Sequence, residues 1–329
     1  MTHLRLVFAG TPEPAVVALD RLLDSDHEVL AVITRPDARR GRGRTLHPSP
    51  VAARAAERGI EVLKPATLKP GTEDGDALRA RLAELAPDAL PVVAYGNLIT
   101  ADLLDVAEHG WVNLHFSLLP RWRGAAPVQA AIAAGDAETG ASTFRIAAGL
   151  DTGDVLAQTH EPIGPEDTTD DLLTRLAYSG ADLLAETMDG LAAGTLTARP
   201  QAELGGEPTH AVKINSADAR IDWTRPTAET DRIIRAHTPA PGAWTMWGER
   251  RMKLGRVVPL AADSEAAAPV AGRPGAVHAG RHSVVVGTAD AAVELTRIQP
   301  PGKKAMAAED WARGALSGTT DEEQGVTFQ

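Results

Sequence analysis

Trp111-Val-Asn-Leu-His-Phe-Ser-Leu-Leu-Pro-Arg-Trp-Arg-Gly-Ala-Ala-Pro-Val-Gln129 is the segment from which the architecture of this chain can be worked out. Its first residues alternate, with Asn113 and His115 set between apolar neighbours. Residues i and i+2 of a β-strand point to the same face, so these two side chains are expected about 7 Å apart along one strand. Buried polar groups are costly unless they are paired. The pair therefore indicates a functional position.

The residues that follow predict a loop and a helix. Ser117-Leu-Leu-Pro120 ends the strand, a turn contains Gly124, and residues 125–134 are typical of a helix. Pro127 falls in the first turn of that helix, where its missing N–H does no harm. Open α/β sheets bind ligands where a strand ends in a loop and a helix begins, so we expect a site here.

Upstream of this segment, apolar strands alternate with amphipathic helices. The predicted strands cover residues 4–9, 28–33, 60–63 and 89–95, and the predicted helices cover 15–23, 50–58 and 76–85. This alternation implies βαβ units and a parallel sheet. The first strand-to-helix turn, Ala9-Gly-Thr-Pro-Glu-Pro14, lacks G-x-G-x-x-G, and its prolines remove backbone donors. A dinucleotide site is therefore not expected.

The downstream half predicts a second domain. A hairpin over residues 142–159 and a helix over 169–188 complete the first domain, which we place at 1–198. Residues 199–213 are rich in Pro, Gly and polar residues and form the predicted linker. Residues 214–329 contain a predicted strand at Arg220-Ile-Asp-Trp223, a helix at 228–237 and several more short strands. Short strands at this spacing indicate a small barrel.

Composition narrows the class of protein. The chain has 329 residues, no cysteine and a formal net charge of −11, which argues against a generally basic nucleic-acid binder. We see no signal peptide and no run of 18 apolar residues, so we expect a cytoplasmic protein without a membrane segment. Cysteine chemistry of any kind is excluded.

One segment is strongly basic despite the acidic composition. The stretch from Arg35 to Arg44 holds five arginines against one aspartate, with glycines and no apolar anchor. A flexible, solvated surface loop is one interpretation. A phosphate-binding arm is the other.

Asn113, His115 and Asp151 form a chemically coherent set. An amide can donate to a developing oxyanion, an imidazole can exchange a proton near neutrality, and a carboxylate can orient that imidazole. Without an enzyme nucleophile, such a set fits direct acyl transfer to an external nucleophile. Two alternatives stay open: a purely structural histidine, and a metal site, although one His and one Asp fall short of the three protein ligands usual at catalytic zinc.

The longer motifs resemble a known family. Asn113-Leu-His115 with the run to Gln129, followed by Gly149-Leu-Asp-Thr-Gly-Asp154, is similar to the methionyl-tRNA formyltransferase family. Further landmarks extend the resemblance over nearly the whole chain: Phe8-Ala-Gly-Thr-Pro12, Gly41-Arg-Gly43, Pro48-Ser-Pro50, Val92-Val-Ala-Tyr-Gly96, Arg220-Ile-Asp-Trp223 and Pro301-Gly-Lys-Lys-Ala-Met306. Asn-x-His with the aspartate alone would indicate only the wider folate-dependent formyltransferase group.

The resemblance implies a fold and a reaction. The first domain would be a Rossmann-like α/β formyltransferase domain with a mixed sheet, and the second an OB-like β-barrel that binds tRNA. The formyl group of 10-formyltetrahydrofolate, as co-substrate, would pass to the α-amine of methionyl initiator tRNA, without a metal. We expect a monomer.

The resemblance also assigns residues to roles. The catalytic set would be Asn113, His115 and Asp151. The folate site would be lined by Ser117, Leu118, Leu119, Pro120, Val93, Ala94 and Tyr95. The acceptor stem would be bound by Arg35, Arg39, Arg40, Arg42 and Arg44.

Three departures and two competing functions accompany this assignment. Thr238-Pro-Ala-Pro-Gly242 differs a little from the aromatic-bearing turn expected in the linker helix region. Phe116 stands where the family usually has a glycine, and Pro91 stands where an apolar residue with an amide is expected. A formyltransferase acting on an amino-sugar nucleotide would share the catalytic set. A non-catalytic RNA-binding protein with a decayed site is the other alternative, and the intact Asn, His and Asp argue against it.

Overall fold

The computed structural model describes residues 3–40, 45–316 and 326–329. The chain divides into two compact units. The first unit comprises Met1–Pro127, Glu138–Pro162 and Leu173–His210, and the second comprises Val128–Ala137, Ile163–Leu172 and Ala211–Gln329. The domain boundaries predicted from the sequence, at residues 198 and 214, stay predictions, because each compact unit is made of three separate segments of the chain.

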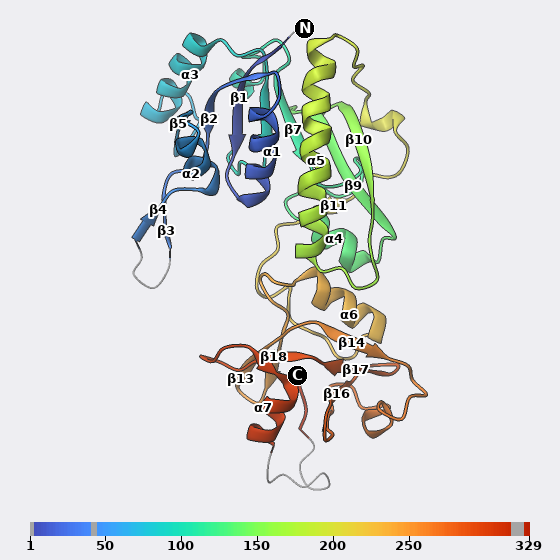
Figure 1. Ribbon diagram of the computed structural model, residues 1–329. Helices are drawn as coiled ribbons and strands as arrows, with labels where there is room; N and C mark the ends of the chain where they lie inside the picture. The colour runs from blue at the N-terminus through green and yellow to red at the C-terminus, as the bar shows by residue number, and fades with distance from the viewer. Residues whose placement is uncertain (1–2, 41–44, 317–325) are drawn as a thin grey trace. The chain divides into compact units, whose positions relative to one another are not determined.

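The first unit is built on a seven-stranded mixed sheet with the order β10-β9-β7-β6-β1-β2-β5 (Figure 1). Its strands are β1 (Arg5–Gly10), β2 (Glu28–Ile33), β5 (Glu61–Leu63), β6 (Leu90–Val93), β7 (Trp111–His115), β9 (Glu138–Arg145) and β10 (Val155–Pro162). The five strands from β7 to β5 pair in parallel, whereas β9 is antiparallel to both β7 and β10. The predicted α/β fold with a mixed sheet is confirmed, and β7 lies where the two pairing modes meet.

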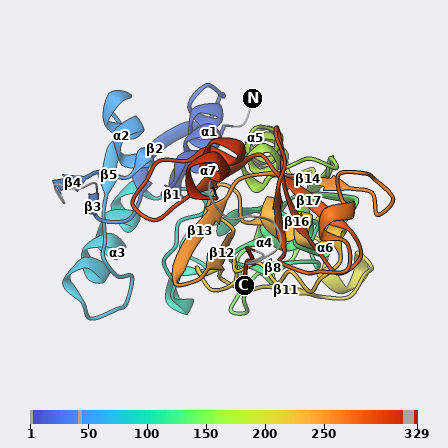
Figure 2. The ribbon, with the colours of Figure 1, turned by 90° about the horizontal axis from the view of Figure 1, so that it is seen from below.

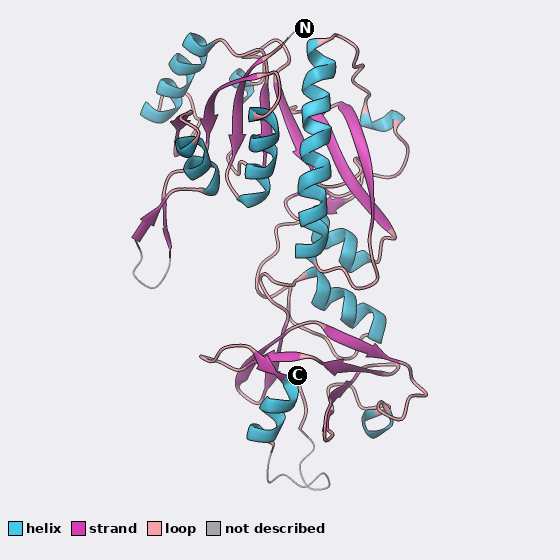
Figure 3. Ribbon diagram, in the orientation of Figure 1, coloured by secondary structure: helices cyan, strands magenta, loops and turns pink. Residues whose placement is uncertain are grey.

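Helices cover both faces of this sheet (Figure 3). They are α1 (Glu13–Leu23), α2 (Pro50–Glu57), α3 (Glu73–Leu85) and α5 (Thr169–Ala192), of which residues 173–192 belong to this unit. Leu6 and Phe8 of β1 share a core with α1, α2 and α5, while Val7 and Ala9 share another with α3. Ser49 caps α2 by accepting a hydrogen bond from the Ala52 amide, and Pro50 follows at the first helical position.

The chain also forms several shorter elements. They are the 3₁₀ turns η1 (Ala101–Leu103) and η2 (Gln201–Glu203), the strand pair β8 (Arg123–Gly124) and β11 (His210–Ala211), and α4 (Pro127–Ala134), which belongs to the second unit from Val128 onward. The basic segment was expected to be a flexible loop. That expectation is wrong for the residues next to positions 41–44, because they pair as two short strands. Ala38–Arg40 and Thr45–His47 form β3 and β4, an antiparallel hairpin that projects from the first unit in Figure 1.

The second unit carries two four-stranded antiparallel sheets. One has the order β12 (Trp244–Trp247), β13 (Arg250–Leu254), β18 (Arg297–Gln299) and β19 (Met306–Ala307); the other has β14 (Val257–Leu260), β17 (Ala292–Leu295), β16 (Val284–Gly287) and β15 (Val277–Ala279). Figure 2 shows β14, β17 and β16 side by side. The helices are α6 (Thr227–Ala236) and α7 (Ala308–Ala315), with a 3₁₀ turn η3 (Ala268–Val270).

Both sheets of the second unit contribute to one core, which agrees with the barrel-like architecture predicted from the sequence. Met252 of β13, Val286 of β16 and Val293 of β17 all belong to it. The predicted strand at residues 220–223 is wrong: Arg220 makes only an isolated bridge to Trp244. The pattern there misled because Ile221 and Trp223 are buried as in a strand, while the pairing with β12 does not extend beyond this one bridge.

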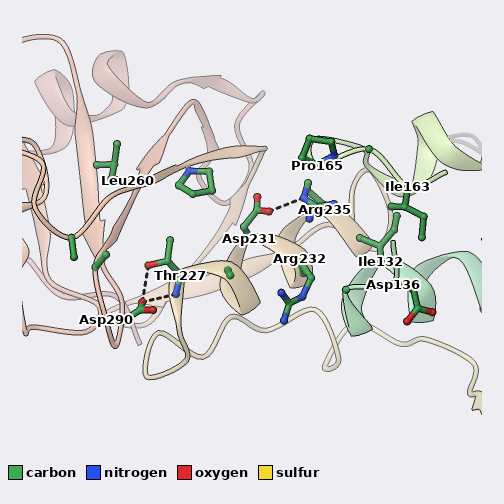
Figure 4. Close-up of a pocket in the computed structure, with 16 residues that line it drawn as sticks. Ile132, Asp136, Ile163, Pro165, Thr227, Asp231, Arg232, Arg235, Leu260 and Asp290 are labelled. Carbon is green, nitrogen blue, oxygen red and sulfur yellow. Dashed lines mark hydrogen bonds and ion pairs between the residues drawn. The ribbon is translucent and has the colours of Figure 1, made fainter. Parts of the chain in front are cut away.

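A cavity of about 620 Å³ lies within the second unit, between α6 and segments at residues 132–136 and 163–165 (Figure 4). Asp231 and Arg235 of α6 form an ion pair of 2.7 Å at its wall, with side chains only 11% and 9% exposed. Arg235 also donates to the Asp167 carbonyl at 2.9 Å. A buried ion pair is sensitive to the loss of one partner, because the other charge remains desolvated.

Replacing Arg235 with Met is therefore expected to lower the free energy of unfolding by about 3–5 kcal/mol. Urea unfolding of the full chain measures the change. The matched control is Arg225→Met, since Arg225 is 64% exposed in its pair with Asp222. That control should change the free energy by about 0.5 kcal/mol or less. A loss below about 1 kcal/mol for Arg235→Met would show that Asp231 does not depend on this partner.

Over the residues that the structure describes, no helix has the length and apolar character needed to cross a bilayer.

Candidate active site

The site is built at the carboxyl end of β7. Val112 and Leu114 point into the core shared with α1 and α5, so Asn113 and His115 lie on the opposite face of the sheet. Across the ladders, Asn113 is paired with Val92 of β6 on one side and Phe144 of β9 on the other. The change from parallel to antiparallel pairing at β7 leaves this strand end bounded by loops from several elements.

The imidazole of His115 is buried and its tautomer is set by the main chain. The side chain is 6% exposed, and Nε2 lies 2.8 Å from the Trp122 carbonyl oxygen. A carbonyl can only accept, so Nε2 carries the proton and Nδ1 is left as the basic nitrogen. Burial lowers the pKa of His115 below 6.5, while Asp151 and the Trp122 carbonyl oppose that shift. The neutral ring is therefore favoured at neutral pH.

Asp151 faces the basic nitrogen of that ring. Its Oδ2 lies 3.8 Å from His115 Nδ1, which is too long for a hydrogen bond but close enough for electrostatic attraction once the ring is protonated. The same oxygen accepts a 2.7 Å hydrogen bond from the Gly124 amide. The structure thus brings together the two titratable members of the predicted set, although the carboxylate does not hydrogen-bond to the imidazole.

The Asn113 amide is available for a ligand. The side chain is half-buried, and it makes no hydrogen bond to any other described residue. An asparagine that is not used by its own fold, next to an imidazole on the same strand face, can direct its N–H₂ toward a bound carbonyl oxygen.

Most of the predicted folate residues after β7 are buried, and their contacts hold the loop itself together. Ser117 is fully buried, and its hydroxyl donates to the Arg121 carbonyl at 2.6 Å. Leu119 is 2% exposed and packs with Phe144. Pro120 is also buried, while Leu118 is half-buried.

The predicted folate residues after β6 lie at the same sheet edge. Val93 is fully buried in the core, and Tyr95 is 2% exposed. Between them, Ala94 is exposed and adopts φ +48°, a left-handed backbone conformation that turns the chain away from the strand. The main chain of this segment is thus the part of it that a ligand can reach.

The five predicted arginines separate into different environments. Arg35 is half-buried and donates to the Asn97 side-chain oxygen, on the loop that follows β6. Arg39 is an exposed residue of β3, and Arg40 ends that strand. Arg42 and Arg44 lie outside the described residues. The sequence grouped these side chains, but Arg35 belongs to the sheet edge rather than to the hairpin.

Three further groups build the site, and no sequence pattern marks them. They are the Trp122 carbonyl, the Gly124 amide and the side chain of Gln201, which donates to the carbonyls of Asp151 and Gly153. The first two are backbone groups, for which residue type carries no signal. Gln201 lies 50 residues from Asp151 in a segment of loop composition.

Two of the departures from the family pattern, Phe116 and Pro91, fit the fold. Phe116 is half-buried and packs against the core shared with α5, with its ring next to Gly180. Pro91 is the second residue of β6 and is buried opposite Val112 of β7. Neither residue takes a place in the set of polar side chains.

An amide and an imidazole at one strand end of an α/β sheet, with a carboxylate from a later loop, are chemically suited to group transfer without a nucleophile from the protein. The comparisons with known proteins identify the class. The family model described as formyl transferase matches residues 4–188, and the model described as formyl transferase, C-terminal domain matches residues 213–316.

Curated relatives narrow this further. A methionyl-tRNA formyltransferase of Corynebacterium aurimucosum is 64% identical over 98% of this chain and 98% of its own length. One from Streptomyces coelicolor is 58% identical over 95% of this chain and 97% of its own. The chain belongs to the formyl transferase family and, within it, to the methionyl-tRNA formyltransferases.

Solved structures share the fold at low sequence identity. An N-formyltransferase from Helicobacter canadensis, in complex with folinic acid and dTDP-3-aminofucose, has a TM-score of 0.65 at 18% identity, over 90% of this chain and 98% of its own. HypX from Aquifex aeolicus in complex with tetrahydrofolic acid has a TM-score of 0.60 at 19% identity, over 99% of this chain and 50% of its own. At these identities the likeness concerns the fold.

Proposed function

We propose that this protein transfers the formyl group of 10-formyltetrahydrofolate to the α-amino group of methionyl initiator tRNA. The observation that carries the proposal is the approach of Asp151 to within 3.8 Å of the one basic nitrogen of His115, beside Asn113. The identity to curated methionyl-tRNA formyltransferases over nearly the full chain supports the choice of acceptor. We also expect a monomeric, cytoplasmic enzyme. Light scattering measures the oligomeric state.

The proposed chemistry assigns one step to each side chain. An α-amine has a pKa of about 7.7–8.0, so a useful fraction is neutral and nucleophilic at neutral pH. Its nitrogen bonds to the formyl carbon while the bond from that carbon to the folate nitrogen breaks. Asn113 donates to the formyl oxygen as negative charge develops there. His115 Nδ1 takes the amine proton and returns a proton to the departing nitrogen, and Asp151 stabilises the ring while it is charged.

The sheet edge also suits a folate. The exposed main chain at Ala94, in the left-handed conformation, offers amide and carbonyl groups of the kind that a pterin ring pairs with. Leu118, which is half-buried, supplies apolar surface on the adjacent loop, and Ser142 and Gln158 hold the turn through the Leu119 main chain. We therefore place the folate between residues 93–95 and residues 117–120.

The basic hairpin is the proposed tRNA contact. Arg39 is exposed on β3, and Arg42 follows it in the same basic stretch of the sequence, so we assign both to a phosphate backbone on a protein that is otherwise acidic. The acceptor stem is the proposed target because the α-amine that reacts is attached to its 3′ end.

Arg39→Ala and Arg42→Ala are each expected to weaken tRNA binding and to reduce the slope of log affinity against log salt by about one unit. The measurement is tRNA binding between low and moderate salt. Arg21→Ala, which removes an exposed arginine of α1 paired with Asp182, is the control and should leave the slope unchanged. Slopes identical to the unsubstituted protein in both hairpin variants would contradict a phosphate-binding role for the hairpin.

One assay tests the reaction and its alternative together. The protein is incubated with 10-formyltetrahydrofolate and, in separate reactions, with methionyl initiator tRNA or an amino-sugar nucleotide, and the formylated product is measured. Formylation of the tRNA supports the proposal. Formylation of the nucleotide alone, or of neither acceptor, overturns it.

A further inference from the structure

We infer that Gln201 is a positioning residue that holds the loop of Asp151 so that its carboxylate faces His115. This inference rests on the proposed function, because it concerns the same catalytic set. Gln201 belongs to η2, beyond the sheet and far from Asp151 along the chain, and its side chain makes no contact with the proposed reacting atoms.

The contacts of Gln201 account for its whole hydrogen-bonding capacity. Nε2 donates to the Asp151 carbonyl at 2.8 Å and to the Gly153 carbonyl at 2.9 Å. Oε1 accepts from Arg123 Nε at 3.0 Å and from Nη2 at 2.6 Å. The residue is 5% exposed, so water cannot replace these bonds easily.

The orientation of the amide follows from its partners. Two carbonyls can only accept and a guanidinium can only donate. A flipped amide would therefore place its oxygen against the carbonyls and its N–H₂ against the guanidinium. Gln201 is therefore a fixed bridge between two segments: the loop that carries Asp151, and Arg123. Gly124, the residue after Arg123, donates a hydrogen bond from its amide N–H to Asp151 Oδ2. The position of the Asp151 carboxylate is thus fixed at two points. Gln201 holds the Asp151 main chain, and Gly124, the neighbour of the Arg123 that Gln201 also binds, holds the carboxylate oxygen.

The Asp151 loop needs such support because its backbone is strained. Asp151 adopts φ +50°, in the left-handed region that costs energy for residues with a Cβ. Gly153, two residues on, passes so close to the Arg145 carbonyl that a Cβ there would lie 1.6 Å from it. A loop with this geometry relaxes when its hydrogen bonds are lost, and the 3.8 Å approach of Asp151 to His115 relaxes with it.

The charge that His115 experiences comes from this loop. Of the described ionisable groups, Asp151 is the one with a Coulombic effect on the ring. From the other elements packed around it, His115 meets uncharged groups: the Trp122 carbonyl and the Phe144 ring, which lies nearly perpendicular to the imidazole. Any change in the distance to Asp151 is therefore reported by the titration of His115.

The test is a double-mutant cycle that uses this titration. The pKa of His115 is measured by NMR on the full chain without substrates, and the signal among the 10 histidines is assigned by its loss in His115→Gln. Gln201→Met removes the bridge without adding charge, and Asp151→Asn removes the charge. We expect Gln201→Met to lower the pKa of His115, and to have no effect when Asp151 is already Asn. With substrates, kcat falls about 10- to 100-fold at an unchanged KM for tRNA.

An unchanged pKa of His115 in Gln201→Met overturns the inference, and so does an equal fall in the Asp151→Asn background. A merely structural role would lower the amount of folded protein and leave the pKa of His115 where it is. Should Gln201→Met not fold, Gln201→Asn, which keeps the amide on a shorter side chain, enters the same cycle. Because the titration needs no substrate, it tests Gln201 separately from the formylation assay that tests the proposed function.

Discussion

Replacing His115 with Ala is expected to lower kcat for formyl transfer by about 10²- to 10⁴-fold, the range that a positioned general base supplies. The affinity for tRNA should change little, because the His115 side chain is buried and the proposed phosphate contacts lie on the basic hairpin. The loss arises in the transition state, where a proton must leave the attacking amine as the new bond forms. Steady-state kinetics and equilibrium tRNA binding together separate the two quantities.

A second substitution isolates the proton transfer from packing. In His115→Gln, the side-chain amide can still donate to the Trp122 carbonyl, which keeps the bond that now fixes the imidazole. It cannot accept a proton, so its kcat should fall as far as that of His115→Ala. A small loss in His115→Gln with a large loss in His115→Ala would assign His115 a packing role. Equal losses in turnover and tRNA affinity would also contradict the assignment.

The pH dependence follows from the same geometry. Burial lowers the pKa of His115 below 6.5, so the basic form of the ring persists into mildly acidic solution. In a plot of kcat against pH, the fall in activity due to protonation of this ring should therefore lie below pH 6.5. Asp151 raises that pKa by attracting the charged ring. Asp151→Asn removes the attraction, and this fall should therefore move to still lower pH while kcat decreases.

Local patterns were sufficient to predict much of the fold. Alternation along residues 111–116 placed Asn113 and His115 on the face opposite Val112, and the core confirms that separation. The strand–helix alternation upstream predicted the parallel sheet, and β2 has the bounds expected from the sequence. These features depend on neighbours in the chain, and a period of two or of 3.6 residues reports them directly.

The remaining features leave little signal in the types of residue that form them. The hairpin of β3 and β4 flanks a glycine- and arginine-rich segment with little of the apolar character that predicts strands. The bridge from Gln201 to Asp151 joins an amide to main-chain carbonyls, which any residue supplies. The sequence could therefore suggest which side chains react, through motif and family resemblance, but not which groups hold them in place.

Replacing Asn113 with Ala is the other substitution with a large expected effect. Loss of a single donor to a developing oxyanion commonly costs about 10²- to 10³-fold in kcat, or about 2.7–4 kcal/mol. The free energy of unfolding should stay nearly unchanged, because the Asn113 amide makes no hydrogen bond to another described residue that its removal could leave unpaired. Kinetics and urea unfolding of the same preparation measure both quantities.

Asn113→Asp sharpens this prediction because it keeps the shape and reverses the chemistry. An ionised carboxylate can only accept, so it would repel the negative charge that grows on the formyl oxygen. It would also place a second negative charge on the same strand face as His115 and raise the pKa of that ring. The aspartate variant should thus be slower than the alanine variant although it is closer in size. If it were the faster of the two, a donated hydrogen bond could not be the contribution of Asn113, and the oxyanion role would have to pass to another group at this edge of the sheet.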